Sequence, residues 1–198
     1  MSEPFFKQWK GKNYSNTRIL VLSESAYSWC KADGTISDPT PSHPKNCVLS
    51  CIDTFPSRGY FRSMCRALCG VECPSKDQIK KMWDDYAYTI YVQRTVGQGA
   101  RKRPSSIQWK EAEQHFRYLL EEIRPLKIIV TGLDMWKDHM PHTYVQRRDG
   151  LEAYRLSDGT LVWCLPLPHP SNSRVGFKWD KIGERIRRFK SAKLPLRK

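Results

Sequence analysis

Residues 161–179, LVWCLPLPHPSNSRVGFKW, place a histidine directly after an apolar run that is typical of a buried strand. Pro170 restricts the backbone of the residue before it, so the position of His169 is well defined. An imidazole held there can donate a hydrogen bond to a carbonyl oxygen that gains negative charge during a reaction. The alternative is a structural histidine whose hydrogen bonds are satisfied within the fold. We also expect Ser171 to cap a helix that begins near Val175.

A carboxylate follows another apolar run, in the segment SESAYSW at residues 23–29. Glu24, the second residue of this segment, can activate a water molecule or accept hydrogen bonds from a nucleobase. The alternative without chemistry is a turn in which a serine hydroxyl only caps the backbone.

A hydrolase is a further alternative, because the chain places a serine, an aspartate and a histidine in the order of the α/β-hydrolase triad. The three residues would be Ser25, either Asp134 or Asp138, and His169. The nucleophile turn of those enzymes needs a small residue two positions after the serine, and Tyr27 stands there. The sequence therefore disfavours this function.

The segment VGQGARKRP at residues 96–104 is rich in glycine and basic residues. It is not a phosphate-binding P-loop, because no Gly-Lys-Ser/Thr follows. We expect its three consecutive cations, and one arginine just before it, to contact phosphates. These residues are Arg94, Arg101, Lys102 and Arg103. A solvated loop without a ligand is the alternative.

The net charge of +14, from 34 Lys and Arg against 20 Asp and Glu, favours a polyanionic partner such as nucleic acid. A basic surface without a dedicated partner is the alternative. The apolar runs are too short to cross a membrane, and the first residues lack the apolar core of a signal peptide. We therefore expect an intracellular protein of the cytoplasm or nucleoid, with no membrane partner.

The seven cysteines fit a reducing compartment. Five of them recur at intervals of four residues, the spacing of one helix face: Cys47 and Cys51, then Cys65, Cys69 and Cys73. Metal and iron–sulfur sites usually contain C-x-x-C pairs, which the sequence lacks. We therefore expect buried free thiols and no metal site.

The coarse pattern alternates strands and helices within a single domain, 1–198. The predicted strands are 18–23, 87–92, 127–132 and 161–167, and the predicted helices lie near 57–69, 75–85, 105–124 and 177–190. Residues 1–17 are expected as an N-terminal extension and 190–198 as a basic tail. This alternation predicts a layered α/β domain with a parallel sheet, whose ligands bind beyond the carboxyl ends of the strands.

Four segments together resemble the uracil-DNA glycosylase superfamily, in its divergent bacterial and phage branch: LSESAYSW, YVQRTVGQGARKRP, IIVTGLDMWKDHMP and LPHPSNSRVGFKW. The resemblance covers about residues 18–189. It implies a three-layer α/β/α sandwich with a central four-stranded parallel sheet, and an extruded base held at the carboxyl edge. It also implies DNA as the partner, single- or double-stranded. We further expect a monomer that needs no cofactor.

The resemblance assigns roles to individual residues. Glu24 falls on the Gln or Glu of the first motif, which contacts the base through its neighbouring backbone, and Tyr27 on a tyrosine that blocks the thymine methyl. His169 falls on the histidine that stabilises the departing uracil anion, and Ser171 on a serine that contacts DNA phosphate. A loop that enters the minor groove, whose arginine can fill the space left by the base, falls on Asn172, Ser173 and Arg174.

The chain also departs from the family pattern. Ser25 stands where the most active members have a water-activating Asp, and Ser23 replaces a glycine. The Asn that reads uracil is missing, with Gln93 as a displaced substitute, which reduces discrimination between bases. The expected catalytic residues are His169 and Glu24, and the expected substrate-binding residues are Ser23, Ser25, Tyr27, Gln93 and Ser171.

Two functions follow from these features. The first is a monofunctional DNA glycosylase that flips a damaged base, of the uracil type or deaminated, and hydrolyses its N-glycosidic bond. The second is a catalytically inactive protein on the same scaffold that binds nucleic acid or nucleotides, or regulates other enzymes. The retained His-Pro-Ser favours the enzyme, and the missing Asp and Asn favour the binder. Group transfer to a modified base is a third, less favoured function.

Overall fold

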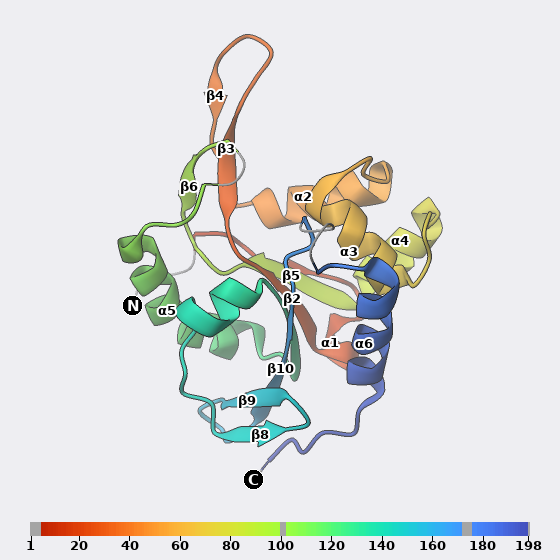
Figure 1. Cartoon of the computed structure of the whole chain (residues 1–198), viewed down its shortest axis with the longest axis vertical. Coiled ribbons are helices and arrows are strands. Elements are labelled where there is room, and N and C mark those ends of the chain that lie inside the picture. Colours follow the sequence, from red (N-terminus) through yellow and green to blue (C-terminus); the bar gives the residue numbers. More distant parts are fainter. Residues whose placement is uncertain (1–4, 100–101, 172–175, 198) are drawn as a thin grey trace.

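The structure is a computed structural model that describes residues 5–99, 102–171 and 176–197 (Figure 1). Its main sheet has seven strands in the order β1-β5-β2-β7-β10-β9-β8. In that order the strands are Trp9–Lys10, Tyr86–Ile90, Ile19–Ser23, Lys127–Thr131, Leu161–Leu167, Leu151–Arg155 and Gln146–Arg148.

The four strands predicted from the sequence form the inner part of this sheet. Strands β5, β2, β7 and β10 are neighbours in that order, and each pair is parallel. The expected size of the sheet is wrong, because β1 pairs antiparallel with β5 and the β8–β9 hairpin pairs antiparallel with β10. The added strands are short or polar and contain no apolar run, so only pairing with a neighbouring edge makes them strands.

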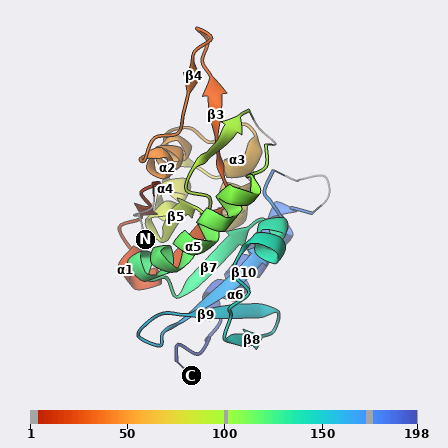
Figure 2. The same ribbon diagram turned by 90° about the vertical axis from the view of Figure 1, so that its left-hand side faces the viewer.

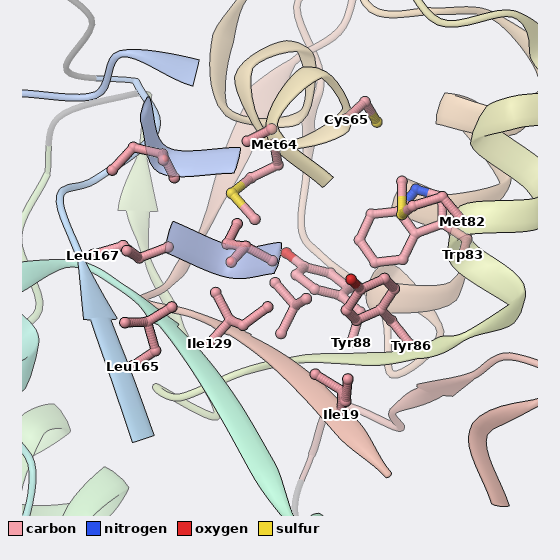
Figure 3. Close-up of a cluster of buried hydrophobic side chains, with 14 of the residues drawn as sticks. Ile19, Met64, Cys65, Met82, Trp83, Tyr86, Tyr88, Ile129, Leu165 and Leu167 are labelled. Carbon is pink, nitrogen blue, oxygen red and sulfur yellow. The ribbon is translucent and has the colours of Figure 1, made fainter. Parts of the chain in front are cut away.

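Side chains of the inner strands alternate between two buried clusters, one on each face of the sheet. Ile19 and Val21 belong to the first cluster, while Leu20 and Leu22 belong to the second. Figure 3 shows the first cluster, where helical side chains such as Trp83 pack against the strands. Because both faces are apolar, both must be covered by helices.

Four helices cover the first face and one long helix covers the second. The first four are α2 His43–Asp53, α3 Gly59–Cys69, α4 Lys76–Asp84 and α6 Trp179–Ser191, and the fifth is α5 Ser106–Ile123. A short helix α1, Tyr14–Thr17, and a π-helical turn η1, Met135–His139, complete the helical elements of the described residues. In the described ranges, no helix is long and apolar enough to span a bilayer.

The predicted helix over 105–124 is confirmed, including its start. The Ser105 hydroxyl accepts a hydrogen bond from the Gln108 backbone N–H, and the Gln108 side chain accepts one from the Ser105 N–H. This reciprocal cap satisfies two amides that the helix leaves free. Helix α2 was not predicted from the sequence, and only Pro44, Val48 and Cys51 of its residues are buried.

Residues expected as terminal appendages belong to the fold. Phe6 is fully buried, and its N–H donates to the Gln93 side chain. At the other end, the Leu161 N–H donates to the Leu196 carbonyl and the Trp163 indole donates to the Pro195 carbonyl. The described parts of 1–17 and 190–198 therefore pack against the main sheet. The basic composition of these segments gave no indication of such contacts.

A second, three-stranded sheet in the order β4-β3-β6 continues from the end of β2. Its strands are β4 Ile36–Ser37, β3 Ala26–Cys30 and β6 Thr95–Gln98. The β3–β4 hairpin projects from the rest of the molecule (Figures 1 and 2). The segment SESAYSW, expected as a turn, is therefore mostly strand, because β6 and β4 supply partners on both sides of β3.

The place where the N-terminal segment crosses the end of α4 gives a test of the fold. A Cβ at Gly11 would lie 2.2 Å from the Trp83 carbonyl oxygen and 2.4 Å from that of Asp84. Because backbone atoms cannot rotate away, we expect Gly11→Ala to lower the free energy of unfolding by about 1–3 kcal/mol. Urea denaturation measures this. Gly176→Ala is the control, because its new Cβ would meet nothing closer than 3.4 Å, and an equal loss in both variants would contradict the packing of this crossing.

Candidate functional site

The carboxyl ends of three inner strands meet at one edge of the main sheet. Glu24 follows β2, Gly132 follows β7, and His169 lies two residues beyond β10. A pocket of about 130 Å³ opens between them. The residues that line it are Glu24, Arg103, Gly132, Leu133, Asp134, Pro168 and His169. Two predicted catalytic residues and one predicted phosphate-binding residue are thus brought together.

Glu24 is a buried carboxylate with one cationic partner. It is 5% exposed, and its Oε2 atom lies 3.3 Å from Arg103 Nη1. The Val92 N–H donates to the Glu24 carbonyl at 2.9 Å, which extends the pairing of β2 and β5 by one step and fixes the backbone. Gly132 faces the carboxylate with a φ of +156°, a conformation that favours glycine.

The surroundings of Glu24 act on its charge in opposite directions. Burial raises the pKa of the Glu24 carboxyl above its ordinary value, the Arg103 guanidinium lowers it, and the Asp134 carboxylate raises it. A carboxylate that is held less strongly in its charged form is a better proton acceptor in a reaction. Glu24 can therefore act as a general base, and its pKa depends on how close the Arg103 guanidinium lies.

His169 is held in one tautomer by its own loop. The Ser171 N–H donates to His169 Nδ1 at 3.3 Å, so in the neutral ring the proton is on Nε2. Burial lowers the pKa of His169 below its ordinary value, Arg103 lowers it further, and Asp134 opposes both. Burial and Arg103 both favour the neutral ring, whose Nε2–H is free to donate a hydrogen bond. The sequence had left the charge of this imidazole open.

Tyr60 of α3 positions the His169 ring, and sequence reasoning missed it. The two ring centroids are 5.7 Å apart. The Thr131 hydroxyl donates to the Leu22 carbonyl at 2.9 Å, so the Tyr60 hydroxyl must be the donor in its own 2.9 Å bond to Thr131. This chain of bonds ties α3 to β7 and β2. No local pattern marks Tyr60, because its role depends on how α3 packs on the sheet.

Arg103 has partners other than the phosphates predicted for it. Its second terminal nitrogen lies 4.0 Å from the Asp134 carboxylate, and its guanidinium carbon lies 5.9 Å from the centre of the Trp109 ring. Trp109 in turn stacks on His139, with the ring centroids 3.9 Å apart. The Arg103 side chain is still 51% exposed, so it can also reach a ligand at the mouth of the pocket.

Several predicted substrate-binding residues lie outside the group that lines the pocket. The Gln93 side chain is 5% exposed and accepts from the Phe6 N–H at 2.8 Å, while its amide nitrogen donates to the Ile90 carbonyl. Both ends of this amide are therefore engaged by backbone, which removes Gln93 as a reader of a base. The Ser23 hydroxyl is bonded to the Tyr88 hydroxyl at 2.9 Å.

Ser25 and Tyr27 bond to each other, with the Ser25 hydroxyl 3.4 Å from that of Tyr27. Ser25 does not line the pocket that contains Asp134 and His169, so the hydrolase triad receives no support. Arg94 pairs with Glu111 at 2.8 Å, also away from this pocket.

The remaining predicted residues divide into two groups. Lys102 and Ser171 are exposed. Ser171 does not cap the last helix as expected, because α6 begins at Trp179 and Lys178 precedes it. The expected DNA contacts Arg101, Asn172, Ser173 and Arg174 lie outside the described residues.

The cysteines form no metal site in the described part of the chain. No group of three or more His, Cys, Asp or Glu is arranged there to hold a metal ion. All seven cysteines are free thiols, of which Cys51, Cys65 and Cys164 are buried, whereas Cys73 is exposed and departs from the expected buried stripe.

Arg103 and Asp134 should shift the charge state of the pocket in opposite directions. We expect Arg103→Gln to raise the pKa of both Glu24 and His169, because it removes the cation that lowers each. We expect Asp134→Asn to lower both, because it removes a carboxylate that raises each. NMR titration of the glutamate carboxyl carbons and histidine ring carbons measures these shifts.

The matched control is Lys137→Gln, which removes an exposed cation outside the pocket. It should leave the pKa of Glu24 and of His169 where they are. Equal shifts in the Arg103 and Lys137 variants would show that net charge, and not the contact at 3.3 Å, sets the two values.

The chain matches no protein-family model and no curated protein. The resemblance to the uracil-DNA glycosylase superfamily therefore stays an expectation drawn from the sequence. What the geometry adds is a neutral imidazole and a buried carboxylate in one pocket, at the carboxyl edge of a parallel sheet.

Proposed function

We propose that this protein is a monofunctional DNA glycosylase, which binds DNA, flips a damaged base of the uracil type or a deaminated base, and hydrolyses its N-glycosidic bond. The observation that carries the proposal is the pocket in which Glu24 and His169 meet. Its volume of about 130 Å³ is well below the ~300 Å³ at which pockets for drug-sized ligands begin. A single flipped ring suits this volume better than a whole nucleotide.

The two side chains supply the two groups that the hydrolysis needs. Water attacks C1′ of the deoxyribose, and the electron pair of the C1′–N bond leaves with the base. The Glu24 carboxylate takes the proton of the attacking water. The His169 Nε2–H donates a hydrogen bond to the base oxygen on which negative charge develops. The base anion then takes a proton from solvent, which leaves a free base and an abasic sugar.

The fold and charge of the protein support the same proposal. The four inner parallel strands, with helices on both faces, agree with the three-layer sandwich that the sequence resemblance implies. In parallel sheets covered on both faces, ligands bind beyond the carboxyl ends of the strands, where this pocket lies. The net charge of +14 suits a DNA partner. We further propose that the protein acts as a monomer inside the cell.

A binding protein without catalysis is the second candidate, and one observation favours it. The Glu24 carboxylate is paired with Arg103 at 3.3 Å, and a paired carboxylate is a weaker base. The residue after it is Ser25, where active glycosylases that the sequence resembles have an Asp. In this function the pocket would hold the base of a nucleic acid or of a nucleotide and leave the glycosidic bond intact.

Labelled oligonucleotides with one uracil, hypoxanthine, xanthine or hydroxymethyluracil distinguish the two functions. Each is incubated single-stranded and in duplex, and alkali then cleaves the strand at any abasic site. We expect the wild-type protein to produce abasic sites from at least one of these bases. His169→Ala should reduce the rate by about 10²- to 10³-fold, because it removes the donor that faces the leaving base.

His142→Ala is the matched control, because this exposed histidine bonds to Tyr144 and does not line the pocket. It should cleave at the wild-type rate. Glu24→Gln should also slow cleavage, by about 10²- to 10⁴-fold, if the carboxylate accepts the water proton. DNA binding without cleavage of any substrate would instead establish the binding protein.

A further inference from the structure

Helix α6 carries a line of cations on its outer surface. Lys178, Lys181, Arg185 and Arg188 recur at intervals of three or four residues, which places them along one side of the helix. All four are exposed. From the first to the last, the line extends about 15 Å along the helix axis. We call these four residues the α6 cation line.

The apolar side of α6 is already used by the core. Ile182, Ile186 and Phe189 are buried in the cluster on the first face of the sheet. Gly183 approaches α3 so closely that a Cβ there would lie 2.7 Å from the Ala67 carbonyl oxygen. Amphipathic helices that lie on membranes need a free apolar face, and α6 has none. What it presents to a partner is charge.

This charge is largely unneutralised. Residues 176–197 contain eight Lys or Arg and two acidic residues. Among the residues that the structure describes, no carboxylate is in salt-bridge contact with Lys178, Lys181 or Arg185, while Arg188 pairs with Glu184. Three of the four cations thus lack a carboxylate partner among the described residues, which favours a polyanion, since each phosphate contact releases a bound counterion.

The α6 cation line begins close in the chain to a residue beside the pocket, and it lies next to β10, the strand that precedes His169. Gly176, two residues before the line, lies against the pocket residue Pro168, since a Cβ at Gly176 would be 3.4 Å from the Pro168 Cβ. Arg185 Nη2 donates to the carbonyl of Pro166 in β10 at 3.4 Å. From there α6 runs back toward the other end of the sheet (Figure 1).

We propose that the α6 cation line is a track for the phosphodiester backbone of nucleic acid, which holds nucleotides that flank the one in the pocket. The inference rests on the DNA partner of the proposed function and adds a contact surface to it. At ~3.4 Å of helix rise per nucleotide of a duplex strand, about 15 Å of cations can face about four phosphates. The contacts are to phosphate and so carry no base preference.

The experiment measures the binding of an undamaged duplex oligonucleotide at several salt concentrations. For the triple variant Lys181→Gln, Arg185→Gln, Arg188→Gln, we expect the slope of log Kd against log salt concentration to decrease in magnitude by about 2–3. The reason is that each phosphate contact contributes about 0.9 to the slope. The matched control is Lys80→Gln, Lys110→Gln, Arg117→Gln, which removes the same charge from α4 and α5.

The control triple should change the slope by less than one contact, that is, by less than about 0.9. Equal slopes in the wild-type protein and the α6 variant would overturn the track. So would equal decreases in both triple variants, because net charge alone would then explain them. Thermal unfolding of each variant verifies that it is folded before binding is compared.

Two further outcomes separate this inference from the proposed function. An unchanged slope in an α6 variant that still releases a damaged base would remove the track and leave the glycosylase. Absence of DNA binding by the wild-type protein would remove both. Binding of the wild-type protein to vesicles that contain phosphatidylserine, lost in the α6 variant while oligonucleotide binding is unchanged, would assign the line to a lipid surface and overturn the proposal.

Discussion

Strand β2 is hydrogen-bonded on both sides, to β5 and to β7, and both pairings are parallel. A strand in this position has every backbone group engaged and both faces buried, which explains its unbroken run of apolar side chains. Parallel pairing also brings the ends of neighbouring strands to the same edge. The chain therefore leaves the sheet at the same edge after each inner strand. The polar residues that follow the strands are brought together at that edge by the topology alone.

The inner strands and most helices could be predicted from the sequence, because apolar periodicity reflects burial on a pleated or helical surface. The small sheet could not. Strand β3 is a strand because β4 and β6 flank it, and those partners come from sequence positions after it. Strand β1, with two residues, is the extreme case, since it exists only through its pairing with Tyr88 and Ala87.

For the candidate site, the residue types were easier to predict than the partners. Glu24 directly follows β2, and His169 lies two residues beyond β10. Because these strands are parallel, the topology alone places both residues at the same edge of the sheet. Gln93 also follows a strand, but the Phe6 N–H and the Ile90 carbonyl bind its amide. Tyr60 joined the site through the packing of α3, a contact without a local sequence signal. Asp134 lies in the turn after β7, where the sequence named it only as a candidate for a hydrolase triad.

The hydrogen bonds between residues 195–196 and β10 have a consequence for folding during translation. Strand β10 pairs with β7, which emerges from the ribosome before it, but α6 and the segment around Leu196 emerge afterwards. The apolar face of β10 therefore stays open while its covering elements are still being synthesised. His169 follows this strand, so the wall of the pocket to which it belongs is completed only after β2, β7 and β10 have all been synthesised. A ribosome-bound chain that ends before α6 would expose that face to chaperones.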